Sequence, residues 1–290
     1  MPVVSAELIE DRDLLPGRRS LGFDAPAIAA TARPGQSVFA RAVEDGAMER
    51  LVPFAIAGVD PAKGSLTIHA GPGARAGPGG GPGPVSRWRL GERVELTGPI
   101  GRGFELEPRS QHLLLVAEGD GLAGLLTLAV ESVRSGRQVT VLAGAPSARD
   151  VYPSTLLPDE VEYVVATADG SLGHAGRVTE LVHDFEAWAD RAFACGPWAL
   201  LAELARLAAG RRARLGVAAL GRKRGGGRVD PPGSPAARRR AFLQVRVEPP
   251  VGCAAATCLG CTVPGVDGPQ RACREGPVFA FDEIAWEAAS

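Results

Sequence analysis

The sequence predicts an α+β multidomain chain with three parts: an antiparallel β-barrel, a doubly wound α/β domain and a small cysteine-rich module. Three observations indicate this order. Residues 1–106 read as short strands separated by turns, residues 107–242 alternate strands with helices, and residues 243–290 carry four of the five cysteines. With 290 residues and 45% hydrophobic content, the chain is long enough to build more than one packed core.

The first part contains short apolar runs separated by turn-forming residues. The runs lie at residues 3–4, 37–40, 51–56, 65–68 and 94–96. Turn signals such as Pro34-Gly35 and Asp60-Pro61 stand between them, and helical periodicity is almost absent. Such spacing favours a small β-barrel, which we expect to end at the glycine-rich segment 98–104. The Gly/Pro stretch 71–84 predicts a mobile loop.

The second part begins with a continuous apolar run at residues 112–117, typical of a parallel strand that is buried on both faces. Helical spacing follows over residues 122–134. Further strands are predicted at 138–143, 161–167 and 191–194, and further helices at 177–184 and 197–209. Strands that alternate with helices indicate a parallel, doubly wound sheet.

Ligands of such sheets bind at the carboxyl ends of the strands. Two predicted strand ends carry glycine turns: Gly119 and Gly121 after the first strand, and Cys195, Gly196 and Pro197 after residues 191–194. We expect these residues to face a nucleotide. The alternative is that they only form the tight turns that this fold requires.

The third part carries Cys253, Cys258, Cys261 and Cys273, which form C-x4-C-x2-C followed by a fourth cysteine after eleven residues. This is the ligand spacing of plant-type [2Fe–2S] ferredoxins. The small residues between the cysteines let the backbone curl and direct amide groups at the sulfurs. Two alternatives remain open. Structural zinc sites usually present two C-x2-C pairs or a Cys/His mixture, and disulfides require an oxidising compartment.

Composition argues against several classes of partner. The net charge of −1 provides no global field for nucleic acid or a membrane surface. No apolar run approaches the roughly 20 residues that a membrane span needs, and residues 1–19 lack a signal-peptide core, so we expect a cytoplasmic protein. Residues 206–240 contain eleven basic residues and one acidic residue. We interpret about 211–240 as a solvated, flexible insertion.

The segments 253–261 and 271–279 closely resemble the C-terminal iron–sulfur module of the electron transfer subunits of NAD-dependent dihydroorotate dehydrogenase, which are ferredoxin reductase-like. Residues 168–176 resemble the Asp-Gly-Ser-x-Gly loop of those subunits, and Cys195-Gly196-Pro197 resembles their Cys-Gly-Pro segment near the nicotinamide. The resemblance implies NAD binding on the α/β domain. Because hydride transfer needs no enzyme nucleophile, we assign no catalytic side chain.

The resemblance also implies FAD on the barrel. In the family, an Arg-Pro-x-Ser strand holds the flavin, with the arginine at the pyrophosphate and the serine at the isoalloxazine. The matching residues here are Val52, Pro53, Phe54 and Ala55, so valine and alanine replace both polar anchors. A second flavin segment falls on Thr67, Ile68 and His69.

The function implied by this resemblance is electron transfer in pyrimidine biosynthesis. Electrons would leave an FMN-containing catalytic subunit that oxidises dihydroorotate, cross the [2Fe–2S] cluster and FAD, and reduce NAD+, within a heterotetramer. One alternative is a related iron–sulfur flavoprotein reductase subunit that serves another partner, such as a sulfide- or ferredoxin-linked enzyme. Another is a degenerate, non-enzymatic partner that keeps the cluster and lacks FAD.

Overall fold

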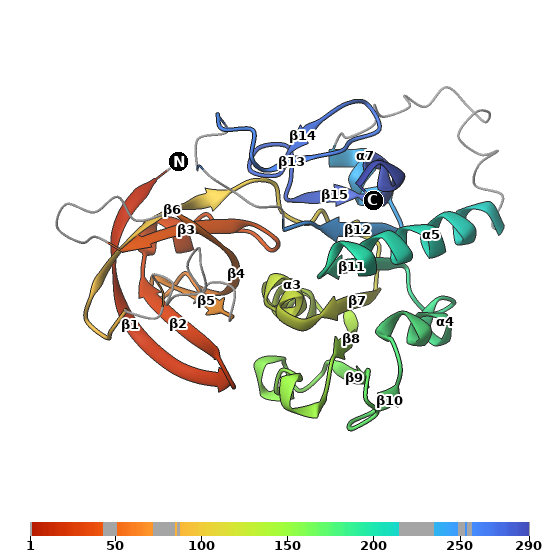
Figure 1. Cartoon of the computed structure of the whole chain (residues 1–290), viewed down its shortest axis with the longest axis horizontal. Coiled ribbons are helices and arrows are strands. Elements are labelled where there is room, and N and C mark those ends of the chain that lie inside the picture. The colour runs from red at the N-terminus through yellow and green to blue at the C-terminus, as the bar shows by residue number, and fades with distance from the viewer. Residues whose placement is uncertain are drawn as a thin grey trace.

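The computed structural model describes residues 2–42, 51–71, 85, 88–214, 235–248, 253 and 257–289. Figure 1 shows a barrel beside a sheet with helices on both faces, and a small C-terminal module above the sheet. The predicted α+β multidomain architecture is confirmed. The predicted Gly/Pro loop lies outside the described residues beyond Gly71, and so do residues 215–234 of the predicted basic insertion.

The N-terminal barrel is a closed antiparallel sheet of six strands in the order β1-β2-β5-β4-β3-β6. Its interior is filled by apolar side chains from every second residue of a strand, as in β5, where Leu66, Ile68 and Ala70 point inward. A short helix, α1 (Pro26–Ala29), follows β2. The strands are β1 (Val3–Leu15), β2 (Arg18–Asp24), β3 (Ser37–Ala42), β4 (Val52–Asp60), β5 (Ser65–Ala70) and β6 (Arg93–Ile100).

The second sheet has seven strands in the order β10-β9-β8-β7-β11-β12-β15. All neighbours in it are parallel except β15, which runs antiparallel to β12. The cysteine-rich end of the chain therefore supplies part of the nucleotide-type sheet. The strands are β7 (His112–Glu118), β8 (Gln138–Ala145), β9 (Glu162–Thr167), β10 (His174–Ala175), β11 (Arg191–Cys195), β12 (Leu243–Arg246) and β15 (Val278–Ala280).

Helices cover both faces of this sheet. Helix α3 lies between the sheet and the barrel, whereas α4 and α5 lie on the other face (Figure 1). Strand β7 shows why, because Leu113 and Leu115 pack into the α3 core while Leu114 and Val116 pack into the α5 core. The α-helices here are α3 (Ala123–Arg134), α4 (Val182–Phe185), α5 (Trp198–Arg214) and α7 (Pro235–Arg240). The 3-10 helices are η2 (Gly119–Leu122), η3 (Ala148–Asp150), η4 (Ser154–Leu156), η5 (Val178–Leu181), η6 (Phe281–Glu283) and η7 (Trp286–Ala289).

The C-terminal module contacts both larger parts. A two-stranded ladder, β13 (Thr262–Val263) with β14 (Gln270–Arg271), forms its centre. At the barrel exit, the Arg102 amide donates to the Gly276 carbonyl, and Arg102 forms a bridge with Pro277. The module is thus attached to the barrel and, through β15, to the sheet. Within the part of the chain that is described, no helix combines the length and apolar character needed to cross a membrane.

Candidate redox-cofactor sites

The four C-terminal cysteines lie on two loops that the β13–β14 ladder brings together. Cys261 precedes β13 and Cys273 follows β14, and their Sγ atoms are 3.3 Å apart. The Cys258 amide lies 3.4 Å from Cys253 Sγ, and the Gly260 amide lies 3.4 Å from Cys258 Sγ. None of the four cysteines forms a disulfide in the described structure. Backbone N–H groups that point at sulfur stabilise thiolate charge, as a cluster site requires.

The cysteine loop contains an unusual backbone conformation. Leu259 has φ 58°, and no other non-glycine residue in the described ranges has a positive φ. This left-handed turn allows the next amide, that of Gly260, to reach Cys258 Sγ. The loop is open to solvent, since residues 257–260 are exposed while Cys261 is buried. The sulfurs therefore span the boundary between the interior and the surface.

The thiols at this site need a cationic partner in order to ionise together. Burial raises the pKa of Cys273 to about 12, and the neighbouring Cys261 and Cys253 contribute to the rise. A bound metal removes this penalty by coordinating the deprotonated sulfurs. Arg271, whose Nη2 lies 2.9 Å from Glu275 Oε1, adds positive charge beside Cys273 and Cys261.

Four cysteines are the number of ligands that a [2Fe–2S] cluster requires. A [2Fe–2S] cluster distributes four thiolates over two irons, so each iron needs a pair of cysteines. Cys261 and Cys273 already form one close pair. The identification of all four residues as ligands stays a prediction.

The predicted flavin strand lies on the side of the barrel that faces the sheet. Phe54 fills the barrel core and Val52 packs partly against it, while Pro53 is exposed. Ala55 is half-buried against the core that contains α3. On β4, the positions of the family's polar anchors therefore hold apolar side chains, which provide no group that would bind a pyrophosphate or a flavin ring.

The second predicted flavin segment is on β5. Ile68 is buried in the barrel and Thr67 is half-buried. His69 stacks on Tyr152 of the α/β domain, with ring centroids 5.7 Å apart and planes inclined by 14°. Its Nδ1 is buried without a hydrogen-bond partner in the described residues, and burial lowers the pKa of His69 to about 4. The imidazole is therefore neutral at pH 7.

A polar clasp joins the barrel to the α/β domain next to His69. Arg18, at the start of β2, forms an ion pair with Asp120, and its Nη1 lies 3.9 Å from Asp150. The Tyr152 hydroxyl donates to Asp120 Oδ1 at 3.0 Å, and burial raises the pKa of this tyrosine. Sequence reasoning did not find this clasp, because its members come from distant segments. The one local signal was an acidic residue inside a glycine turn.

The two predicted glycine turns lie side by side in the structure. Ala117 pairs with Cys195 in the sheet, so the ends of β7 and β11 are adjacent. A Cβ on Gly121 would collide with the backbone of Cys195 and Gly196, which makes glycine a steric requirement there. Pro197 follows directly and accepts a hydrogen bond from the Leu201 amide of α5. The predicted nucleotide-binding residues thus lie together at the carboxyl ends of β7 and β11, which form one edge of the sheet. Their role stays a prediction.

Acidic groups surround this edge. Burial raises the pKa of Glu118, and Arg177 opposes that rise. The carboxylate of Asp120 is compensated by Arg18. The loop predicted from residues 168–176 lies near the next strands, where Ser171 Oγ bridges Asp169 Oδ1 (2.6 Å) and the Ala148 amide (2.8 Å). These contacts tie the loops after β8 and β9 together.

Cys195 is a buried thiol and not an activated nucleophile. Burial raises its pKa to about 12, and Glu248 adds to the rise while Arg246 opposes it. Its Sγ lies 3.8 Å from Glu248 Oε1 and 3.9 Å from Arg246 Nη1. Arg246 is a further residue that the sequence did not single out.

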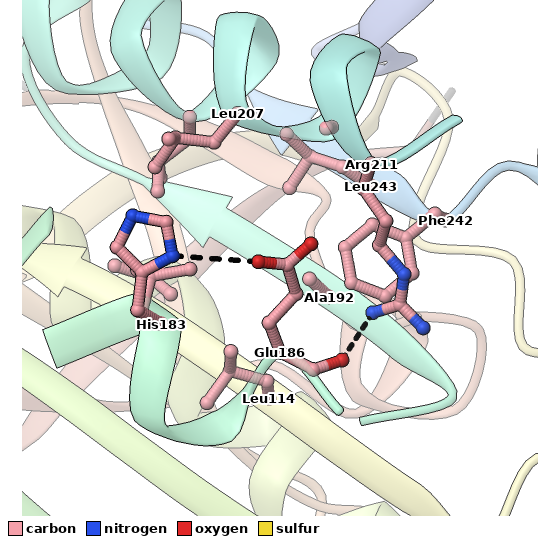
Figure 2. A pocket seen from close by; sticks show the side chains of 12 residues that line it. Leu114, His183, Glu186, Ala192, Leu207, Arg211, Phe242 and Leu243 are labelled. Atoms are coloured by element: carbon pink, nitrogen blue, oxygen red, sulfur yellow. Dashed lines mark hydrogen bonds and ion pairs between the residues drawn. The ribbon is translucent and has the colours of Figure 1, made fainter. Parts of the chain in front are cut away.

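A small cavity on the opposite face of the sheet, between α4 and α5, is too small for a cofactor (Figure 2). Its volume is about 20 Å³, close to that of one water-sized probe. Arg211 lies 3.8 Å from the ring centre of Phe242 and donates to the Glu186 carbonyl, and His183 Nδ1 is 3.4 Å from Glu186 Oε2. The rest of the lining is mostly aliphatic, so this cavity is a packing feature.

Sequence comparisons link the chain to known electron transfer subunits. Residues 248–285 match the model of the iron–sulfur cluster binding domain of dihydroorotate dehydrogenase B. The electron transfer subunit of dihydroorotate dehydrogenase B (NAD(+)) from Desulforamulus reducens is 32% identical over 98% of this chain and 99% of that protein. The corresponding subunit from Shouchella clausii is 30% identical over 87% of this chain and 86% of that protein.

A solved structure shares the whole architecture. A chain of the NADH-dependent reduced ferredoxin-NADP oxidoreductase covers 98% of this chain with a TM-score of 0.75, and 91% of that chain is matched. At 20% identity this likeness concerns the fold alone. The sequence relatives carry the assignment further: the chain belongs to the family of dihydroorotate dehydrogenase B electron transfer subunits.

Proposed function

We propose that this chain carries electrons from a dihydroorotate-oxidising flavoprotein subunit to NAD+, through a [2Fe–2S] cluster and FAD, in pyrimidine biosynthesis. The observation that carries the proposal is the cysteine module, which matches the family's iron–sulfur domain and is built into the same sheet as the Cys195-Gly196 turn. Strand β12 lies next to β11 and then leads towards the cysteine loop. One continuous segment therefore connects the predicted cluster with the predicted nicotinamide site.

Each part of the chain has a defined task in this proposal. Cys253, Cys258, Cys261 and Cys273 hold the irons, while backbone amides at the sulfurs balance their charge. The cluster passes single electrons, whereas a flavin combines two of them into a hydride. The glycine turns of β7 and β11 admit the nicotinamide dinucleotide, and Arg18 offsets the negative charge of Asp120 at that edge.

FAD would lie where the barrel faces the α/β domain. The described residues fit its ring end, because His69 offers a buried nitrogen without a partner and polar groups of β3 and β12 lie beside Ala55. The segment expected to cradle its phosphates continues past Gly71, beyond the described residues. No cation on β4 meets a pyrophosphate.

The partner in this proposal is an FMN-containing catalytic subunit, with two copies of each chain in a cytoplasmic heterotetramer. The family name implies a catalytic partner. The exposed cysteine loop supports docking near the cluster, since the Leu259 side chain is 63% exposed beside Cys258. Electron transfer needs such an accessible route to the partner's flavin.

Reconstitution with a dihydroorotate dehydrogenase catalytic subunit tests the proposal. The two chains together should reduce NAD+ with dihydroorotate, while neither chain alone should do so. A complex that reduces NAD+ only with another electron donor would indicate a related reductase subunit. Protein that retains iron and sulfide without flavin absorbance would indicate a non-enzymatic cluster-binding partner.

A further inference from the structure

Strand β4 lacks a polar group for the flavin ring, but its neighbour β3 has one. Ala55 stands directly opposite Ser37 in the β3–β4 ladder. Ser37 is buried, and its Oγ accepts a hydrogen bond of 2.7 Å from Arg246 Nη2. The hydroxyl that is missing at position 55 therefore exists one strand away, where it is already held by a guanidinium.

Arg246 joins the parts of the molecule at this point. Only 3% of the residue is exposed, and it is the last residue of β12. Its Nε donates to the Gly35 carbonyl at 3.1 Å, and Nη1 pairs with Glu248 and lies 3.9 Å from Cys195 Sγ. Barrel residues and the predicted nicotinamide turn therefore contact the same side chain.

Helix α3 approaches the same guanidinium. A Cβ on Gly124 would lie 3.0 Å from Arg246 Cδ and equally close to Cys195 Sγ.

The contacts of Arg246 with the protein account for four of the five N–H groups of an arginine. Their partners are Ser37, Gly35, Glu248 and Cys195. One N–H of Nη2 has no acceptor among the described residues.

We propose that Arg246, supported by Ser37, is the polar partner of the flavin ring in this chain and replaces the serine that position 55 lacks. The inference rests on the proposed FAD function. It assigns the ring's charge partner to β12, the strand that also leads towards the cluster. Arg246 is thus a positioning residue for both the flavin ring and Cys195.

The charge of Arg246 has a redox consequence. Two electrons from the cluster and one proton from solvent convert the neutral oxidised flavin into a reduced anion, which later returns to the oxidised form by giving a hydride to NAD+. A guanidinium fixed in a buried site stabilises the anion more than the neutral form. It therefore raises the two-electron midpoint potential of the flavin.

Three variants test this assignment in the full-length protein. Arg246→Met removes the charge and keeps the length, Arg246→Lys keeps the charge, and Ser37→Ala removes the hydroxyl. The FAD dissociation constant and the flavin midpoint potential are measured for each. We expect the equilibrium constant for reduction of the flavin to be at least tenfold lower in Arg246→Met than in the wild type. This corresponds to a midpoint potential lower by about 30 mV for a two-electron couple. The lysine and alanine variants should shift less, in the same direction.

Arg238→Met is the matched control. Arg238 is also 3% exposed and donates to Glu283, but it lies in α7. Both methionine variants lose a buried arginine that forms an ion pair, so both should melt at lower temperature, whereas only Arg246→Met should change the potential and the FAD affinity. Should Arg246→Met fail to fold, unchanged potentials in Arg246→Lys and Ser37→Ala would overturn the inference. Equal potentials for wild type and a folded Arg246→Met would also overturn it. A wild type that does not bind FAD would instead refute the flavin step of the proposed function, and this inference with it.

Discussion

In the proposed function, the cluster module and the flavin face of the barrel belong to the same electron path, yet their sequences differ in how directly they specify a site. The four cysteines form a local pattern within 21 residues, and the structure brings Cys261 and Cys273 to 3.3 Å. The flavin strand, in contrast, carries Val52 and Ala55 where polar anchors were expected. Beside Ala55, a polar group comes from β3, where Ser37 stands opposite it, and Ser37 is bonded to Arg246 of β12.

The difference teaches that residues which bind a metal directly are more tightly constrained in sequence than residues which only provide hydrogen bonds and charge around a cofactor. An iron needs a sulfur atom from its own ligand residue, so a cysteine cannot be replaced by a neighbour. A flavin ring needs hydrogen bonds and charge, which any adjacent strand can supply. A local motif can therefore be lost while the site's chemistry is retained.

The largest effect is expected at the cysteine loop. The double variant Cys258→Ser, Cys261→Ser removes one thiolate of the close Cys261–Cys273 pair and one thiolate outside that pair. Bound iron, measured by elemental analysis, should fall to near zero. Cys195→Ser is the control, because this buried thiol lies in the α/β domain and its loss should leave the iron content unchanged. Iron retained by the double variant would show that the module's cysteines are not the ligands.

A smaller effect is expected at the edge of the sheet. Gly121→Ala places a methyl group against the backbone of Cys195 and Gly196, so the two strand ends must separate. We expect NAD+ affinity to fall at least tenfold, measured by titration. Gly136→Ala has a positive φ of 78° but open space around it, so it should cost about 1 kcal/mol of stability without changing NAD+ affinity. Equal affinities in the two variants would contradict a nucleotide site at this edge.

His69, in the second predicted flavin segment, should make the free energy of unfolding depend on pH. The pKa of His69 is about 4 in the folded protein, against 6.5 for the ordinary side chain, so the unfolded chain binds more protons between these values. The free energy of unfolding should therefore fall as pH drops from 6.5 to 4, by up to about 3 kcal/mol from this residue. Urea denaturation of His69→Phe, which preserves an aromatic contact with Tyr152, should show a shallower fall.

His183→Phe is the matched control for that experiment, because the His183 side chain is 64% exposed. Its pH dependence should follow that of the wild type. A His69→Phe variant with the full wild-type slope would mean that His69 is protonated freely in the folded state, contrary to its buried, unpartnered Nδ1.

The smallest effect is expected at Leu259. Glycine adopts a φ of 58° without strain, and the Leu259 side chain packs little because it is largely exposed. Leu259→Gly should keep its full iron content and change the free energy of unfolding by no more than about 1 kcal/mol. Loss of iron in this variant would show that the loop's side chains, and not only its cysteines and amides, hold the cluster.

The fold could be predicted from the sequence because its signals are periodic. Alternating residues in β5 and the unbroken apolar run of β7 each specify how a strand is buried. The role of β12 and β15 in the large sheet was not predicted, since β15 is only three residues long and pairs with a strand more than thirty residues earlier. Short strands of this kind depend on tertiary contacts.

The site was predictable only where its residues are neighbours in sequence. The glycine turns and the cysteines were found from local motifs, and the sheet brings the two turns together. The Arg18–Asp120–Tyr152 clasp and the Ser37–Arg246 pair join residues separated by more than thirty positions. Charges that meet only through folding leave no spacing pattern in the chain.

The most direct test of the central claim is metal analysis of anaerobically purified wild-type protein, combined with EPR before and after reduction. Two irons and two acid-labile sulfides per chain are expected, with an EPR signal that appears only when one electron is added. Zinc in place of iron, or iron without labile sulfide, would contradict the claim that this module is the entry point of an electron path.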